Sequence, residues 1–369
     1  MKNHHIFFLI VVLLSSTGCR KRTEDKKCAD SGFSTSFTSR NFSMGFTTWP
    51  FGPDYADREA TYQFISANAD IYSEQFDNYI PWKVLMNNQP FPTDLTNDIA
   101  SRISLRPIAH QLLLSVSLLN IQRNDLLADA DGTLPVYTSM DDPAIVDAYT
   151  KYVKYLVGQF QPDYLVLAME VNEFRIKQES KWPGYKNLIQ VVKNRLKVDY
   201  PALQIAESVT LHNWFNPAVT NPDTYIIEIT NYVNQQDFVA ISFYPFLKGQ
   251  QTKQAFQEAF DFLNSRATKP IAFVETAHIA EDLSVPAFNV SIKGDVCQQN
   301  EYLETLLSNA RQHPYEFLIW WTHRDYDELW QIFPDSTKDL GKLWKDTGLQ
   351  NESGQERPAL VTWKGVLNK

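Results

Sequence analysis

Several signatures of well-known chemistry are missing from this 369-residue sequence. Its seven histidines form no His-x-His pair and no His-Glu-x-x-His motif, so the usual zinc-hydrolase patterns have no support and we expect no metal. Gly-x-Ser-x-Gly, the phosphate-binding P-loop and the dinucleotide fingerprint are also absent. Their absence removes the usual signs of an α/β-hydrolase, an NTPase or a nicotinamide enzyme, and we expect no cofactor.

Positive charge is scarce as well. The chain carries 34 Lys and Arg against 43 Asp and Glu, which gives a formal net charge of -9. Residues 20–27 contain the one short basic run, which has the composition of a solvated tether. A nucleic-acid partner is therefore not expected.

The N-terminus has the features of an export signal. Residues 6–14 form an apolar run that is too short for a permanent membrane span but typical of a signal-peptide core. Ser16 to Cys19 resembles a bacterial lipobox, which predicts cleavage before Cys19 and a lipid anchor on its thiol. An ordinary secretory signal with an incidental cysteine is the alternative. Because Arg20 rather than Asp follows, we expect an exported bacterial lipoprotein of the outer membrane, on its periplasmic face or at the cell surface.

The chain has only three cysteines. If Cys19 carries lipid, Cys28 and Cys297 remain, and an oxidising compartment would allow them to pair. Two separate thiols fit the sequence equally well. We expect a signal peptide over residues 1–18, a lipidated tether over residues 19–41 and one domain over residues 42–369.

Beyond residue 41, short apolar runs alternate with amphipathic stretches. The apolar runs are rich in β-forming residues and mostly apolar throughout, as parallel strands buried on both faces are. Between them lie helical patterns, the clearest beginning at Asp142 and Pro143, which suit an N-cap and a first helical position. This alternation, without a Gly-rich loop after the first strand, predicts an α/β protein with a (β/α)8 TIM barrel. The expected strands are Ser43–Thr48, Ala69–Gln75, Gln111–Leu119, Tyr164–Asn172, Leu203–Val209, Phe238–Tyr244, Pro270–Glu275 and Phe317–Thr322.

Two carboxylates stand where such a barrel carries its chemistry, at the C-terminal ends of strands. The strand predicted over residues 164–172 is followed by Glu173, and the strand over residues 270–275 ends on Glu275. Two acids in one pocket suit the cleavage of a glycosidic bond, since one protonates the leaving oxygen and the other is an anion. Strand alternation places Glu170 on the same side of the predicted strand as Asn172. We therefore interpret Glu170 as an acid that supports the site from below instead of a catalyst.

These residues resemble the clan A glycoside hydrolases, whose barrels end strand 4 in Asn-Glu and strand 7 in Glu. The resemblance extends over most of residues 43–369. Within the clan, "ISFYPF" (residues 241–246) and "VETAH" (residues 274–278) look most like family 53, the arabinogalactan endo-β-1,4-galactanases. The resemblance implies a retaining glycoside hydrolase that acts on a β-linked polysaccharide, possibly a galactanase-like one.

Carried over by position, the resemblance also implies a role for individual residues. Glu173 would be the general acid/base and Glu275 the nucleophile, with Tyr244 holding Glu275 in place. Asn172 would hydrogen-bond the sugar 2-hydroxyl. Trp321 would lie beneath the sugar, since clan A barrels often carry a tryptophan at the end of strand 8.

Further side chains near strand ends complete the expected sugar contacts. Sugar rings expose flat C–H faces that stack on aromatic rings, so Trp49, His212 and His278 are candidate substrate-binding residues. One departure from the clan lies near the end of strand 2, where "DIYSEQFDNYIPW" contains no arginine to steady the nucleophile. This departure supports the alternative hypothesis of a surface lipoprotein that binds glycans on a glycosidase-like barrel without hydrolysing them.

Overall fold

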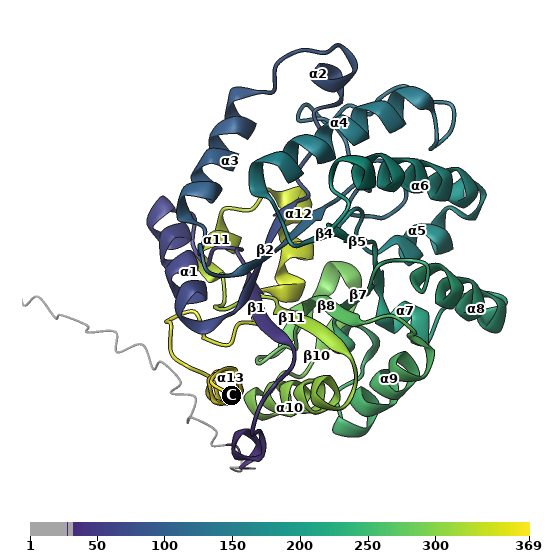
Figure 1. Cartoon of the computed structure of the whole chain (residues 1–369). Helices are drawn as coiled ribbons and strands as arrows, with labels where there is room; N and C mark the ends of the chain where they lie inside the picture. Colours follow the sequence, from purple (N-terminus) through teal and green to yellow (C-terminus); the bar gives the residue numbers. More distant parts are fainter. Residues whose placement is uncertain (1–27, 29–31) are drawn as a thin grey trace, which may run out of the picture.

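Parallel strands surrounded by helices form a nearly closed barrel (Figure 1). The computed structural model describes Cys28 and residues 32–369. The strand order of its nine-stranded sheet is β5-β4-β3-β2-β1-β11-β8-β7-β6. Because only Glu207 separates β5 from β6, these two act as halves of one strand, and the sheet has the eight positions of a TIM barrel. The (β/α)8 fold predicted from the sequence is confirmed.

The strands begin close to where the sequence predicts them. Each barrel strand overlaps a predicted apolar run, and these strands pair in parallel, with β1 hydrogen-bonded to both β2 and β11. A small antiparallel hairpin, β9–β10, lies outside the barrel. The bounds are β1 (Ser43–Thr47), β2 (Ile71–Phe76), β3 (Gln111–Val116), β4 (Tyr164–Val166), β5 (Gln204–Ala206), β6 (Ser208–Thr210), β7 (Val239–Phe243), β8 (Ile271–Thr276), β9 (Leu283–Val285), β10 (Val290–Ile292) and β11 (Tyr315–Trp320).

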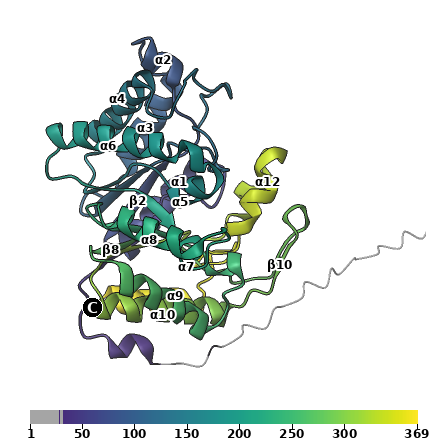
Figure 2. The same cartoon turned by 90° about the vertical axis from the view of Figure 1, so that its right-hand side faces the viewer.

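Helices cover the outside of the barrel. The Asp142 side chain caps α4 by accepting a hydrogen bond from the Ala144 amide, and Pro143 opens the helix as expected. The β9–β10 hairpin and α12 project from the same side of the molecule (Figure 2). The helices are α1 (Tyr55–Asn68), α2 (Trp82–Met86), α3 (Thr93–Leu105), α4 (Pro143–Phe160), α5 (Val171–Lys177), α6 (Trp182–Asp199), α7 (Leu211–Phe215), α8 (Pro222–Val233), α9 (Lys253–Arg266), α10 (Val296–Gln312), α11 (Asp327–Gln331), α12 (Asp335–Gly341) and α13 (Pro358–Leu367).

The predicted strand over residues 164–172 is wrong in its second half. β4 ends at Val166, and α5 begins at Val171. Between them Glu170 adopts a left-handed backbone with φ 54°, and its amide donates a hydrogen bond of 2.9 Å to Ser208 Oγ. The chain therefore turns into α5 at Glu170, so that Asn172 and Glu173 lie on a helix instead of at a strand end.

The core has two layers, as expected when strands are buried on both faces. One cluster fills the inside of the barrel and includes Ile71, Leu113, Val274 and Phe317. A larger cluster lies between the strands and the helices. Backbones approach closely at β1, where a Cβ atom on Gly45 would lie 1.8 Å from the carbonyl oxygen of Ile71, so only glycine fits there.

Part of the segment expected to be a tether packs on the barrel. Phe37 is buried, and Arg311 of α10 lies over its ring at 4.6 Å. Cys28 and Cys297 form a disulfide with a Cα–Cα distance of 5.2 Å, which joins this segment to α10. Cys19 and the predicted signal peptide lie outside the described residues. Within Cys28 and residues 32–369, no helix combines the length and apolar composition that a membrane span requires.

Candidate active site

Glu275 lies near the C-terminal end of β8, where its side chain is enclosed by the barrel rim. It is only 7% exposed. The Tyr244 hydroxyl donates to its Oε2 at 3.2 Å, and the Gln75 amide donates to its Oε1. Burial raises the pKa of Glu275 to about 8; the charge of Glu170 raises it too, while Arg123 opposes the shift. This buried carboxyl thus receives hydrogen bonds from two neutral donors, and its pKa is raised.

Glu170 is the carboxylate with the largest electrostatic effect on the pKa of Glu275, ahead of Asp77. It follows β4, and its side chain is partly exposed. Arg123, from the segment between β3 and α4, forms an ion pair with Glu170 at 3.0 Å between Nη2 and Oε2. Ser242 of β7 donates to Glu170 Oε1 at 2.8 Å. These contacts place Glu170 at the barrel rim between β4 and β7, on the same side as Glu275.

Glu173, the acid singled out in the sequence, has other neighbours. From α5 its carboxylate accepts hydrogen bonds from Thr210, at 2.7 Å, and from Asn213, and Lys177 lies 3.5 Å away. Burial alone would raise the pKa of Glu173, but the bonds from Asn213 and Thr210 outweigh burial and lower it. A carboxyl held as an anion is a poor proton donor at neutral pH.

Asn172 is fully buried, with 0% exposure. Its amide nitrogen donates to the Thr210 carbonyl at 3.0 Å, and its Oδ1 accepts from the Thr210 amide at 2.8 Å. These bonds fasten α5 to β6 and use both ends of the side-chain amide. Asn172 thus joins two scaffold elements, and its expected contact with a sugar hydroxyl stays a prediction.

The two tryptophans expected to bind sugar lie together. Trp321 follows β11 and packs on Trp49, which follows β1, with ring centroids 5.1 Å apart. Trp49 also lines a cavity of about 210 Å³ that reaches Gln75 and Asp77. Since Gln75 is bonded to Glu275, this cavity lies next to the buried carboxyl. Its lining combines aromatic and polar side chains.

The two candidate histidines differ in position. His212, at the start of α7, is buried beside Glu173 and Glu170; burial lowers its pKa, while both carboxylates act to raise it. His278 is 0% exposed, its Nδ1 lies 3.0 Å from the Ile279 carbonyl oxygen, and burial lowers its pKa to about 4. Its ring packs on Phe256. His278 is thus packed within the barrel wall, and its expected sugar contact stays a prediction.

Three contributors to the site were missed in the sequence. Gln75 lies near the end of β2, where the strand-end rule could have found it even though the clan arginine is absent. Ser242 lies on β7 inside a motif noted only for its aromatic residues. Arg123 lies in a segment without regular structure, where no sequence pattern marks a residue for the site.

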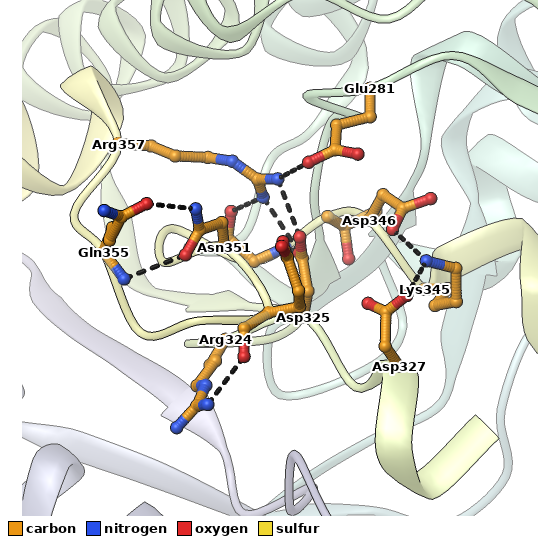
Figure 3. Close-up of polar contacts among 12 residues, drawn as sticks. Glu281, Arg324, Asp325, Asp327, Lys345, Asp346, Asn351, Gln355 and Arg357 are labelled. Atoms are coloured by element: carbon orange, nitrogen blue, oxygen red, sulfur yellow. Dashed lines mark hydrogen bonds and ion pairs between the residues drawn. The ribbon is translucent and has the colours of Figure 1, made fainter. Parts of the chain in front are cut away.

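A cluster of acids lies near the segment that follows β11 (Figure 3). Oxygens of Asp325, Asp327 and Asp346 lie within 4.8 Å of one another, a spacing that could suit a cation. Lys345 already bonds to Asp327 and Asp346 at 2.5 Å each, and Arg357 pairs with Asp325 at 2.7 Å. These two cations offset part of the acids' charge, and Arg357 fastens the segment to the start of α13.

Comparisons with known proteins agree on the fold. No protein-family model matches the chain, and no curated protein matches its sequence. Among solved structures, GH5_18 from Bifidobacterium longum subsp. longum aligns with a TM-score of 0.64 at 15% identity, covering 89% of this chain and 79% of its own. The exo-β-1,4-mannosidase Op5Man5 from Opitutaceae bacterium strain TAV5 aligns with a TM-score of 0.65 at 11% identity, covering 89% and 60%.

A GH53 catalytic domain from Ignisphaera aggregans aligns as well, with a TM-score of 0.53 at 15% identity, covering 90% of this chain and 92% of that domain. Because GH5 and GH53 structures are both similar, family 53 is not singled out. At these identities the similarity establishes the fold alone. The chain therefore shares a TIM-barrel fold with these glycoside hydrolase structures.

Proposed function

We propose that this protein is a retaining glycoside hydrolase that acts on a β-linked glycan, with Glu170 and Glu275 as its reacting carboxyls. The observation that carries the proposal is the position of these two side chains at one barrel rim, where Arg123 and Ser242 hold Glu170. Gln75 and Tyr244 hold Glu275. Glycosidic cleavage needs one carboxyl that holds a proton and one that is an anion. A close pair meets this need, since the charge on one member raises the pKa of the other.

Glu170 replaces Glu173 in this assignment. Ser242 and Arg123 hold Glu170 at the rim, whereas Glu173 points to Thr210 and Asn213. Retention of configuration requires carboxyls roughly 5 to 5.5 Å apart, with the sugar between them. Trp49 and Trp321 would supply the stacking surface beside the pair.

The substrate belongs to the class of β-linked polysaccharides or oligosaccharides. One similar structure is titled as a GH5_18 variant in complex with Manb1-4GlcNAc, and another as an exo-β-1,4-mannosidase. These titles support testing β-mannosides as substrates. β-1,4-Galactan is tested as well because of the family 53 resemblance, and β-glucan and xylan complete the panel of glycans.

A panel assay with three matched variants tests this function. Purified protein is incubated with each glycan, and released sugar is measured for wild type, Glu170→Gln, Glu275→Gln and Glu173→Gln. We expect the first two variants to lose roughly 10²- to 10⁴-fold in kcat, the range for a general acid or base. Glu173→Gln serves as the control and should keep its rate within roughly tenfold. An equal loss in Glu173→Gln, with its fold intact, would return the acid role to Glu173.

A second candidate function is glycan binding without hydrolysis. The specific observation that favours it is Gln75, a neutral amide, as hydrogen-bond donor to Glu275 where the clan commonly has arginine nearby. Calorimetric titration of the same glycans distinguishes the two. Tight binding of one glycan by wild type, with no sugar released from any of them, would support the binding protein.

We also propose that the protein is exported and anchored through lipid on Cys19, at the outer membrane. The proposal rests on the signal-like N-terminus, and the Cys28–Cys297 disulfide is compatible with an oxidising compartment. Labelling with radioactive palmitate in a bacterial host tests it. Wild type should carry label in the membrane fraction, and Cys19→Ser should carry none; label on both would refute the assignment of Cys19.

A further inference from the structure

The N-terminal segment is attached to both ends of α10. At one end Cys28 is bonded to Cys297, in the first turn of the helix. At the other end Arg311, in the last turn, donates to the Ser36 carbonyl at 3.1 Å and lies over the Phe37 ring. Because an α-helix rises 1.5 Å per residue, the two attachment points are about 20 Å apart along α10. The disulfide therefore holds Cys28 far from the point where the segment packs on the barrel.

The disulfide end of α10 lies at the barrel rim that carries the proposed site. Since each helix follows a strand, α10 begins on the side where the strands end. Near its start Gln299 donates to the Gly348 carbonyl at 3.1 Å, in the segment that follows β11. The other end of α10 is on the opposite side, where Arg40 pairs with Asp70, just before β2, at 2.6 Å. The disulfide thus fixes Cys28 at the rim, although the segment leads into β1 from the opposite end.

Two large apolar side chains are exposed on the same rim. Phe288, in the turn between β9 and β10, is 47% exposed, and Ile332, between α11 and α12, is 64% exposed. The β9–β10 hairpin and α12 project from one side of the molecule (Figure 2), and β9 packs next to the turn Lys342–Trp344 that follows α12. Both side chains would gain free energy on entering an apolar environment.

The sequence before Cys28 limits how far a lipid on Cys19 can be from this rim. Residues 20–27 separate the two cysteines. Even at full extension, this stretch spans at most about 30 Å. Because the disulfide fixes Cys28 to the start of α10, the residues after Cys28 add nothing to this reach. Without the disulfide, the chain from Cys19 to Ser36 would reach about 55 Å and would be attached at the opposite end of the barrel.

We propose that the rim around the β9–β10 hairpin is a docking surface for the lipid bilayer that holds Cys19, with Phe288 and Ile332 as the side chains that enter it. This inference rests on the lipid anchor proposed above and goes beyond the glycosidase function. The short tether brings the rim to the membrane, where binding strengthens with the apolar area that is buried. The disulfide selects this rim instead of the opposite end. The proposed carboxyl pair therefore lies on the side of the barrel that faces the membrane.

Energy transfer from protein to membrane measures this orientation. Full-length lipidated protein is reconstituted in vesicles of equal amounts of phosphatidylethanolamine and phosphatidylglycerol, with an acceptor dye on a fraction of the headgroups. A donor dye is attached to a cysteine introduced by Ala287→Cys, at the hairpin tip, or by Ile108→Cys. Ile108 is 93% exposed and lies just before β3, at the opposite end of the barrel. We expect more transfer from position 287 than from position 108. Equal transfer, or more from position 108, would overturn the proposal.

A surface variant tests the apolar contact. Phe288→Ser combined with Ile332→Ser should reduce the transfer from position 287, because the rim then loses the side chains that hold it at the bilayer. Val198→Ser is the matched control, since Val198 is 81% exposed near the end of α6, on the side where the strands begin. It should leave the transfer unchanged. Unchanged transfer in the double variant would refute the docking surface.

A disulfide variant tests the orientation. In Cys28→Ser combined with Cys297→Ser, the tether is longer and its attachment moves to the other end of α10. The difference in transfer between positions 287 and 108 should therefore shrink, and an unchanged difference would refute the role of the disulfide. The surface variant retains the disulfide, so it decides the contact even if this variant unfolds.

Failure of the earlier proposals would give other results. Wild type that does not sediment with the vesicles would overturn the docking surface together with the lipid anchor. A protein that hydrolyses none of the glycans would defeat the glycosidase function alone, because the transfer measurements involve no substrate and would still decide which side of the barrel faces the membrane.

Discussion

Removal of Arg357 should destabilise the protein more than any other loss of a single charge in the cluster of Figure 3. Its guanidinium is 5% exposed and pairs with Asp325, which is 0% exposed, through bonds of 2.9 and 2.7 Å. It also donates to the Gly348 carbonyl at 2.7 Å. Breaking a buried pair from one side costs about 3–5 kcal/mol, because the other charge stays buried without compensation. At roughly 2 °C per kcal/mol for a large domain, Arg357→Met should lower the Tm by roughly 6–10 °C.

The size of this loss should depend on pH. Burial raises the pKa of Asp325 to about 8, and Arg357 opposes that effect. A carboxyl with a raised pKa binds a proton in the folded protein but not in the unfolded chain, so stability falls as pH rises from about 4 toward the folded pKa. Without Arg357 the Asp325 carboxyl retains its proton more readily. The loss in Arg357→Met should therefore be larger at about pH 8.5 than at about pH 5.5.

Urea denaturation at both pH values, followed by tryptophan fluorescence, measures this effect. Arg324→Met is the matched control, since the neighbouring Arg324 is only half-buried and stacks on Phe51 at 3.9 Å. It should cost about 1 kcal/mol, as exposed cation–π contacts do. If Arg357→Met lost no more free energy of unfolding than Arg324→Met at the higher pH, the reasoning from burial would be refuted.

Three further predictions concern stability. Phe46→Ala should cost about 3–5 kcal/mol in urea denaturation, because this buried ring packs 4.6 Å from Trp363 and its loss leaves a cavity; a cost below about 1 kcal/mol would contradict that packing. Glu275→Gln should raise the Tm relative to wild type, and this difference should grow between about pH 4.5 and 8. The reason is that the raised pKa of Glu275 lowers the stability of wild type over that range; a pH-independent difference would argue against a buried proton there. Cys297→Ser should cost about 2–4 kcal/mol without reductant, and dithiothreitol should abolish the difference from wild type; a difference that survives reduction would point to packing instead of the disulfide.

Much of the fold could be predicted because its signals are local. A barrel strand is buried on both faces, so each strand appears as a short apolar run. Asp142 and Pro143 mark the start of α4, because a helix cap and a first-turn proline act within one turn of the helix. Glu275 could be located for the same reason, since it lies at the end of such a run and the strand-end rule applies to it directly.

The position of Glu170, the proposed partner of Glu275, is set by contacts that no local pattern encodes. The apolar run after Tyr164 continues past Val166, but a hydrogen bond to Ser208 on another strand helps turn the chain at Glu170. That turn sends Asn172 and Glu173 into a helix and leaves Glu170 at the rim. Arg123 reaches the site from a segment without regular structure. The sequence by itself thus determined the barrel and one carboxyl, because periodicity and burial act along the chain. Only the tertiary structure decided which second carboxyl and which cation meet it, because long-range hydrogen bonds and charges select them.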